Sequence, residues 1–417
     1  MSLGFEQAGF DIAAAIEIDP VHCATHEFNF PRTTTICASV VALSADEIRS
    51  RANLGTRDID VVFGGAPCQG FSMIGKRALD DPRNQLVFHF VRLVQELGPK
   101  LCVFENVKGL TLGRHAAFLD ELIGALGAAG YTVGLPYQVL NAADFGVPQD
   151  RRRLFLVAAR DGITLPNYPA PLAVASSART TVSQAIGDLP DADGFDLLRM
   201  IDEVPVSWHS ESRYARLLRG LDVDPTDFGY LRRFAPDLLT SSLRTEHSAV
   251  SRARFAATPH GATEPISRFR KLPPNGLCNT LRAGTDSARG AFTSPRPIHP
   301  SLPRVITVRE AARLHSYPDW FRFHATKWHG FRQIGNSVPP LLARAVAAEV
   351  MRSTGLHPVK PETTLATGAP ELLRMDMGGA AAHFGVPHTT IAQRTRATRP
   401  AAVNNAIQVQ LFKDEHA

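Results

Sequence analysis

Short apolar runs alternate with longer amphipathic segments through the first 160 residues of the chain. A short apolar run between turn residues is typical of a buried strand, and apolar residues at helical spacing predict a helix. Strands are predicted over 12–18, 61–63, 101–104 and 154–159, and helices from Pro20 and over 84–97 and 116–130. This alternation predicts right-handed βαβ units, and therefore an α/β fold with a doubly wound, mainly parallel sheet.

The hydrophobic pattern weakens at about residue 164 and returns in two segments, 308–314 and 341–351. The intervening chain is rich in Pro, Arg, Ser, Thr and Asp, which indicates an irregular second module. Its arginine clusters with interleaved aromatic residues fit a solvated surface, but their number favours contact with nucleic acid. After Gly355 a faint helix-turn-helix pattern covers 377–396, although a disordered or accessory tail is the favoured interpretation.

Composition narrows the class of protein. The 417 residues carry 45 Lys and Arg against 40 Asp and Glu, and this net charge of +5 mildly favours a polyanionic partner. Five scattered cysteines without metal-ligand spacing indicate a reducing compartment and no metal site. No apolar run approaches the roughly 18 residues that span a bilayer, and the chain begins without the pattern of a secretory signal. We expect a cytoplasmic protein with no membrane partner.

Candidate chemistry lies at the ends of three predicted strands, in Pro67-Cys68, in Glu105 and in Arg151 with Arg153. Open α/β sheets bind ligands at such edges, so Cys68 is a candidate nucleophile. Arg151 and Arg153 would lie on one face, because side chains alternate along a strand. Each feature alone has a plainer explanation, namely an inert buried thiol, a salt-bridge partner and a solvated basic edge.

In this order along the chain, the motifs Pro67-Cys68-Gln69, Glu105-Asn106-Val107, Gln149-x-Arg151-x-Arg153 and Gly335-Asn336-Ser337-Val338-Pro339 resemble those of DNA (cytosine-5)-methyltransferases. The resemblance covers residues 1 to about 350. It implies a Rossmann-like, S-adenosylmethionine-dependent methyltransferase fold with a second, irregular target-recognition domain. The implied division is a catalytic domain over 1–180, the target-recognition domain over 181–277, a return to the first domain over 278–355, and a carboxyl-terminal extension over 356–417.

The resemblance implies a covalent mechanism on a flipped-out cytosine. Cys68 would attack carbon 6 of the ring as a thiolate. Glu105 would contact ring N3 and the exocyclic amine. Arg151 and Arg153 would bind the base carbonyl and hold Glu105 and the Cys68 loop in place.

S-adenosylmethionine is the implied methyl donor, with no metal. Its expected contacts are spread along the chain: Glu17, Ile18, Ser39, Pro67, Leu86, Asn336 and Val338. Glu17 suits ribose hydroxyls and Ile18 would pack on the adenine, whereas Ser39 stands where the family usually carries an Asp.

The family's first strand, with its Phe-x-Gly-x-Gly-Gly loop, has no counterpart in this sequence. Either Met1 is an internal or misassigned start, or the enzyme is degenerate or split. We favour the first interpretation, because the other catalytic motifs are intact, and we expect the catalytic domain to be amino-terminally truncated.

Double-stranded DNA is the expected partner, and a restriction endonuclease acting independently is a candidate second partner. We expect a monomer. The alternative function is a catalytically impaired relative that only binds DNA. Methylation of RNA is less favoured, because the large arginine-bearing module suits recognition of a duplex.

Overall fold

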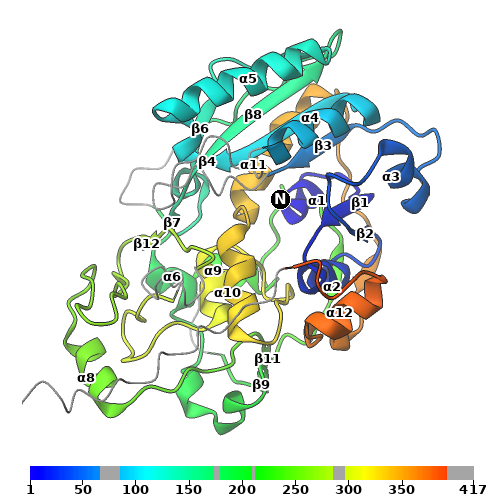
Figure 1. Ribbon diagram of the computed structural model, residues 1–417. Coiled ribbons are helices and arrows are strands. Elements are labelled where there is room, and N and C mark those ends of the chain that lie inside the picture. Colours follow the sequence, from blue (N-terminus) through cyan, green and yellow to red (C-terminus); the bar gives the residue numbers. More distant parts are fainter. Residues whose placement is uncertain (66–84, 173–178, 209–211, 285–295, 392–417) are drawn as a thin grey trace, which may run out of the picture.

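The computed structural model describes residues 1–65, 85–172, 179–208, 212–284 and 296–391 (Figure 1). Within these ranges no helix is long and apolar enough to cross a membrane. The elements of the amino-terminal part are α1 (Ser2–Gln7), β1 (Ala14–Glu17), α2 (Pro20–Asn29), β2 (Thr34–Cys37), α3 (Ala45–Arg51), β3 (Val61–Gly64), α4 (Gln85–Leu97), β4 (Leu101–Val107), α5 (Arg114–Ala128), β5 (Tyr131–Val133), β6 (Gln138–Asn141), β7 (Gln149–Asp150) and β8 (Arg152–Arg160).

The main sheet has the strand order β3-β4-β8-β5, and β6 also pairs with β8. The predicted α/β class is confirmed, and β3 pairs with β4 in parallel. β8 differs from the parallel expectation, because it runs antiparallel to β4, β5 and β6. After β4 the chain passes through α5 and forms β5, which is parallel to β4 but not adjacent to it. β8 lies between β4 and β5 and runs antiparallel to both.

Alternation of side chains along β4 builds a core on each face of this sheet. Leu101 and Val103 face α1 and α11 (Pro340–Ser353), whereas Cys102 and Phe104 face α4 and α5. The helices on the two faces are visible in Figure 1. Burial on both faces explains why the strands read as nearly continuous apolar runs in the sequence.

β1 and β2 form a separate parallel pair, in which Glu17 lies opposite Cys37. Among the described residues no hydrogen-bonded ladder joins β1 to β3. All residues of β1 and of β3 are only half-buried, unlike residues at the centre of a covered sheet. The sheet is therefore split between β1 and β3.

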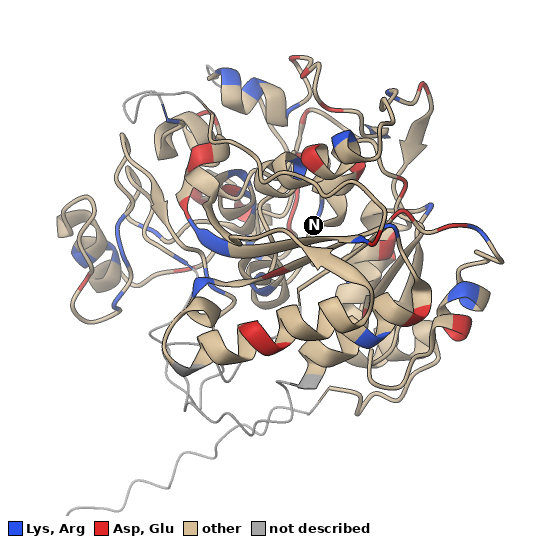
Figure 2. Cartoon of the chain, turned by 90° about the horizontal axis from the view of Figure 1, so that it is seen from above, with Lys and Arg blue, Asp and Glu red and all other residues tan. Residues whose placement is uncertain are grey.

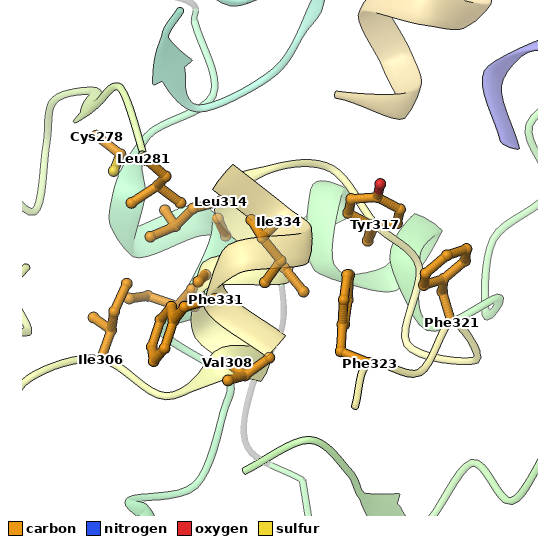
Figure 3. Close-up of a cluster of buried hydrophobic side chains, with 14 of the residues drawn as sticks. Cys278, Leu281, Ile306, Val308, Leu314, Tyr317, Phe321, Phe323, Phe331 and Ile334 are labelled. Carbon is orange, nitrogen blue, oxygen red and sulfur yellow. The ribbon is translucent and has the colours of Figure 1, made fainter. Parts of the chain in front are cut away.

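The central part of the chain contains only short elements, as its composition predicts. They are α6 (Val182–Ile186), β9 (Val204–Pro205), α7 (Arg213–Leu218), β10 (Leu231–Arg233), β11 (Leu238–Leu239), α8 (Ala249–Ala257), β12 (Cys278–Asn279), α9 (Val308–Leu314) and α10 (Lys327–Asn336). Figure 3 shows apolar side chains of α9, α10 and the segments around 278–281 and 317–323 pointing toward one another. This cluster is the core of the second half of the molecule.

Two buried arginines, one in α9 and one just before it, form ion pairs with acidic residues of the recognition range, residues 181–277. Arg313 binds Asp188 at 3.0 Å and Asp319 at 2.6 Å, and Arg304 binds Asp191 at 2.9 Å. Figure 2 shows the positions of Lys and Arg interspersed with those of Asp and Glu along the described backbone. Within 181–277, Arg232 is buried and pairs with Glu6 at 2.8 Å, and Arg244 and Lys271 are also buried. Several basic residues of this range therefore serve the fold, which the sequence clusters alone did not indicate.

The first part of the carboxyl-terminal extension, up to residue 391, packs against the rest of the chain. β13 (Thr364–Ala366) pairs in parallel with β10, whereas a 3-10 turn (Pro370–Leu373) and α12 (Met377–Phe384) pack against α2. Leu372 and Leu373 are buried there with Ala24 and Phe28. The first half of the helix-turn-helix pattern is thus a helix docked on the first domain, and residues 392–417 lie outside the described part.

We expect acid to destabilise the fold through Glu310. Burial by itself raises the pKa of this carboxyl, but Arg304, at 2.8 Å, and His299 outweigh burial and lower the pKa to about 2. Because this folded pKa lies below the ordinary value, the stabilisation is complete above about pH 4.5 and is lost as the pH falls toward 2. His299, whose pKa burial lowers to about 4, acts in the same direction.

Urea unfolding at a series of pH values measures this effect. The free energy of unfolding of the native chain should fall by about 3 kcal/mol between pH 4.5 and 2 in excess of that of Glu310→Gln. Equal acid sensitivity of the two proteins would show that Glu310 is not responsible.

Candidate active site

Glu105 lies at the start of the segment that carries the candidate nucleophile. β3 ends at Gly64, which lies opposite Phe104 of β4. A Cβ atom placed on Gly65 would lie 2.7 Å from Oε2 of Glu105, so only glycine fits without a shift. Pro67 and Cys68 lie outside the described residues, but the chain enters their segment against the Glu105 carboxylate.

Arg153 pairs with Glu105 across the two neighbouring strands. Its Nε lies 3.0 Å from Oε1 of Glu105, and both side chains are about 12 % exposed. Burial lowers the pKa of the Arg153 guanidinium from its ordinary value, and Glu105 partly opposes that shift. The structure thus brings Glu105 and Arg153 together at the carboxyl end of β4, as the sequence predicted, and leaves their polar ends partly open to a ligand.

Arg151 is placed differently from the expectation that it contacts a base carbonyl. Its guanidinium is buried and donates to the carbonyl oxygens of Leu281 at 2.7 Å and of Gly335 and Ser337 at 2.8 Å. Burial, and next the charge of Arg153, lower the pKa of the Arg151 side chain. Arg151 therefore lies beneath the site and holds the segments that surround it.

Gln149 and His315 form a second buried brace, which the sequence analysis missed. The amide nitrogen of Gln149 donates to Nδ1 of His315 at 3.0 Å, and Nε2 of His315 donates to the Ser337 carbonyl at 3.1 Å. Burial, followed by the charge of Arg151, lowers the pKa of His315 well below its ordinary value. A neutral His315 matches this pattern of one acceptor and one donor nitrogen. The one sequence signal for this pair of residues is that Gln149 belongs to the Gln149-x-Arg151-x-Arg153 motif.

The expected donor contacts of the first strands share one sheet edge. Oε1 of Glu17 accepts hydrogen bonds from the backbone N–H groups of Ile18 at 2.8 Å and Asp19 at 2.9 Å, which fixes its carboxylate at the end of β1. Ile18 is 39 % exposed beside it, as an apolar surface for a ring would be. Ser39 follows β2, and its hydroxyl accepts from the N–H of Val41.

Of the other expected contacts, two lie on helices, one lies between two helices, and Pro67 is outside the described residues. Asn336 is the exposed last residue of α10, Val338 is buried among the side chains between the main sheet and α11, and Leu86 lies half-buried in the first turn of α4. A Cβ atom on Gly335 would lie 2.2 Å from the backbone nitrogen of Ala283, so glycine is required where α10 ends. No group of three or more metal-ligating side chains occurs among the described residues.

Known proteins resemble the chain over most of its length. The family model described as C-5 cytosine-specific DNA methylase matches residues 1–352. Type II methyltransferase M.XorII of Xanthomonas oryzae pv. oryzae is 63 % identical over 402 residues, which cover 96 % of this chain and 94 % of that protein. Type II methyltransferase M1.HphI of Haemophilus parahaemolyticus is 34 % identical, covering 84 % of this chain and 83 % of its own length.

A solved structure supports the same relationship. A prophage-encoded protein of E. coli, described as a DNA modification methyltransferase, is 33 % identical and superposes with a TM-score of 0.66. The similarity covers 85 % of this chain and 96 % of that one. The carboxyl-terminal extension beyond residue 352 lies outside the family match.

We expect Arg151→Lys to destabilise the fold, because one ammonium group cannot reach three carbonyl oxygens that a planar guanidinium spans. The loss should be about 2–4 kcal/mol in the free energy of unfolding, measured by urea denaturation. Arg152→Lys is the matched control, since the neighbouring Arg152 side chain is 55 % exposed. Equal stability of the two variants would contradict this role of Arg151.

Proposed function

The chain belongs to the C-5 cytosine-specific DNA methylase family, and we propose that it methylates carbon 5 of a cytosine flipped out of a specific duplex DNA sequence. S-adenosylmethionine would supply the methyl group. The observation that carries the proposal is the Glu105–Arg153 pair at the start of the Cys68 segment. A restriction endonuclease that acts independently on the same sequence is the proposed functional partner.

Cys68 would serve as the covalent nucleophile. Carbon 5 of cytosine is a poor nucleophile, and addition of the Cys68 thiolate to carbon 6 turns the ring into an enamine that can accept a methyl group at carbon 5. Loss of the carbon 5 proton and expulsion of the thiolate then restore the aromatic ring. Cys68 comes three positions after Gly65, a span of about 10 Å at most, so the thiol can reach a base held by Glu105.

Glu105 would hold the Watson–Crick edge of the base while Arg153 holds Glu105. The carboxyl can contact ring N3 and the exocyclic amine together, and a proton at N3 offsets the charge that develops in the ring on thiolate addition. Arg153 can reach the neighbouring base carbonyl while it fixes the carboxylate. Arg151 acts one layer below, as a positioning residue. This edge-on contact requires extrusion of the base from the stack, which takes a few kcal/mol.

The donor would bind at the edge formed by Glu17, Ile18 and Ser39. The residues present fit part of such a site, because an anchored carboxylate and an exposed isoleucine lie together at one strand end. The split between β1 and β3 lies beside this edge. We propose that an additional parallel strand and glycine loop, the element without a counterpart in the given sequence, completes the donor site there.

Replacing Cys68 by Ser should reduce methyl transfer at least 100-fold, and Glu105→Gln should reduce it about 10²–10⁴-fold. Transfer of labelled methyl groups to mixed-sequence DNA measures both, with binding of the same DNA as the control for folding. Undiminished transfer by Cys68→Ser would exclude the covalent mechanism.

Binding of S-adenosylmethionine should depend on the additional strand and glycine loop proposed above. Calorimetry should show weak binding of S-adenosylmethionine by residues 1–417 and at least tenfold tighter binding by a chain extended upstream with that strand and loop, because unpaired strand edges leave the site incomplete. Equal, tight binding by both chains would refute the proposed completion.

The split sheet also favours one alternative function, a relative that binds DNA but is impaired in catalysis. The two functions differ in one result. If the extended chain binds S-adenosylmethionine and DNA but shows no transfer that depends on Cys68, the chain is the binding protein.

A further inference from the structure

A compact turn over Glu264–Arg270, here called the 264–270 turn, lies near the end of the recognition range, residues 181–277. Its two ends meet in an antiparallel bridge between Thr263 and Arg270. Within it the Glu264 N–H donates to the Phe269 carbonyl at 2.8 Å, and the Arg268 N–H donates to the Glu264 carbonyl at 2.8 Å. The backbone of the turn is therefore closed on itself by main-chain bonds.

The Glu264 carboxylate braces the turn from inside. Its side chain is 2 % exposed, and its oxygens accept from the N–H groups of Ser267 at 2.6 Å and Ile266 at 3.2 Å. Arg254 of α8 lies 3.5 Å away on the inner side. The Glu264 carboxylate is thus bound within the turn, whereas Ile266 and Arg268 are exposed at the tip.

Arg268 adopts a backbone conformation that glycine adopts more easily. Its φ angle is +58°, in the left-handed region. Ser241 and Ser316 also have positive φ, but both are buried and accept hydrogen bonds from Phe323 and Leu341. Strain of this kind is characteristic of functional sites. Arg268 combines this backbone conformation with an exposed position at the tip of the turn.

The turn is joined firmly to the rest of the molecule. Phe269 packs against Phe255 and Ile298, and Lys271 donates to the carbonyls of Phe255 and Ala256 at 3.1 Å. The chain then runs on to β12, which pairs with β7 directly beside Arg151. The turn is therefore connected through a short, bonded segment to the floor of the candidate active site.

Charge indicates what the tip would contact. The segment 249–272, which contains α8 and the turn, carries five basic residues and one acidic residue, Glu264. Arg252 pairs with Asp193, Arg254 lies beside Glu264 and Lys271 is buried, so the exposed basic residues of the turn are Arg268 and Arg270. Two exposed arginines in one turn suit a polyanion. An exposed arginine beside an exposed isoleucine (65 % for Ile266) further matches the base edges of the major groove, where Arg pairs with guanine and apolar groups meet the thymine methyl.

We propose that Arg268, supported by Ile266, is a specificity-determining residue that reads a base pair of the target duplex. This inference rests on the proposed function, because it takes duplex DNA as the substrate. The main-chain bonds of the 264–270 turn fix the backbone that carries Arg268 before DNA binds, so little backbone order has to be created in the complex.

Selection of bound sequences from a random duplex library tests the proposal without requiring turnover. The native chain should enrich one sequence. Arg268→Gly and Arg268→Ala should lose at least tenfold discrimination at one base pair, with less than threefold change in affinity for unrelated DNA. Arg233→Ala is the matched control, since Arg233 is exposed on β10 and its loss removes the same charge.

Arg268→Gly separates recognition from a structural role. Glycine relieves the backbone strain, so this variant should unfold at the same or a higher temperature than the native chain while its discrimination falls. Unchanged sequence preference in Arg268→Gly, or no preference in the native chain, would overturn the inference. Absence of methyl transfer with preserved sequence preference would instead contradict the proposed function and leave this inference standing.

Discussion

Buried arginines determine how the two halves of this molecule meet. Arg151, Arg304, Arg309 and Arg313 are among the largest fully buried side chains. Taking a guanidinium out of water costs free energy unless protein acceptors replace the water, so each of these arginines requires a specific set of acceptors. Those acceptors come from distant segments, such as Asp188 for Arg313 and the Ser337 carbonyl for Arg151. The network thereby fixes the recognition range and the Gly335–Pro339 motif against the sheet.

The candidate site follows from this arrangement. The main sheet presents Glu105 and Arg153 side by side, and Arg151 with His315 secures the segment that bears Asn336. The half that would act on the base is therefore preorganised by groups below it. The half that would hold the donor lies at the end of β1, in a strand pair that is separate from the main sheet.

Several predictions made from local pattern agree with the structure. The seven helices and strands predicted in the first 160 residues lie close to their predicted ranges, although shorter elements such as β2, β5 and β6 had no predicted range. The Glu105–Arg153 pair follows from strand ends that meet at one edge. The reversed direction of β8 was not predictable, because an apolar run reads the same in either direction. The burial of Arg151 was also missed, since alternation along a strand says which side a residue faces but not what covers that side.

The sequence by itself determined the fold class, the family resemblance and the residue types of the chemistry, because periodicity and motif spacing are local properties of the chain. Only the tertiary structure decided which arginine of the Gln149–Arg153 motif faces Glu105, which one is enclosed by carbonyl groups, and that β1 stands apart from β3. It also revealed the braced 264–270 turn, in which a glutamate is buried and an arginine presented. These features depend on contacts between separate segments of the chain, on side-chain hydrogen bonds or on backbone angles, and none of these leaves a periodic trace in the order of residues.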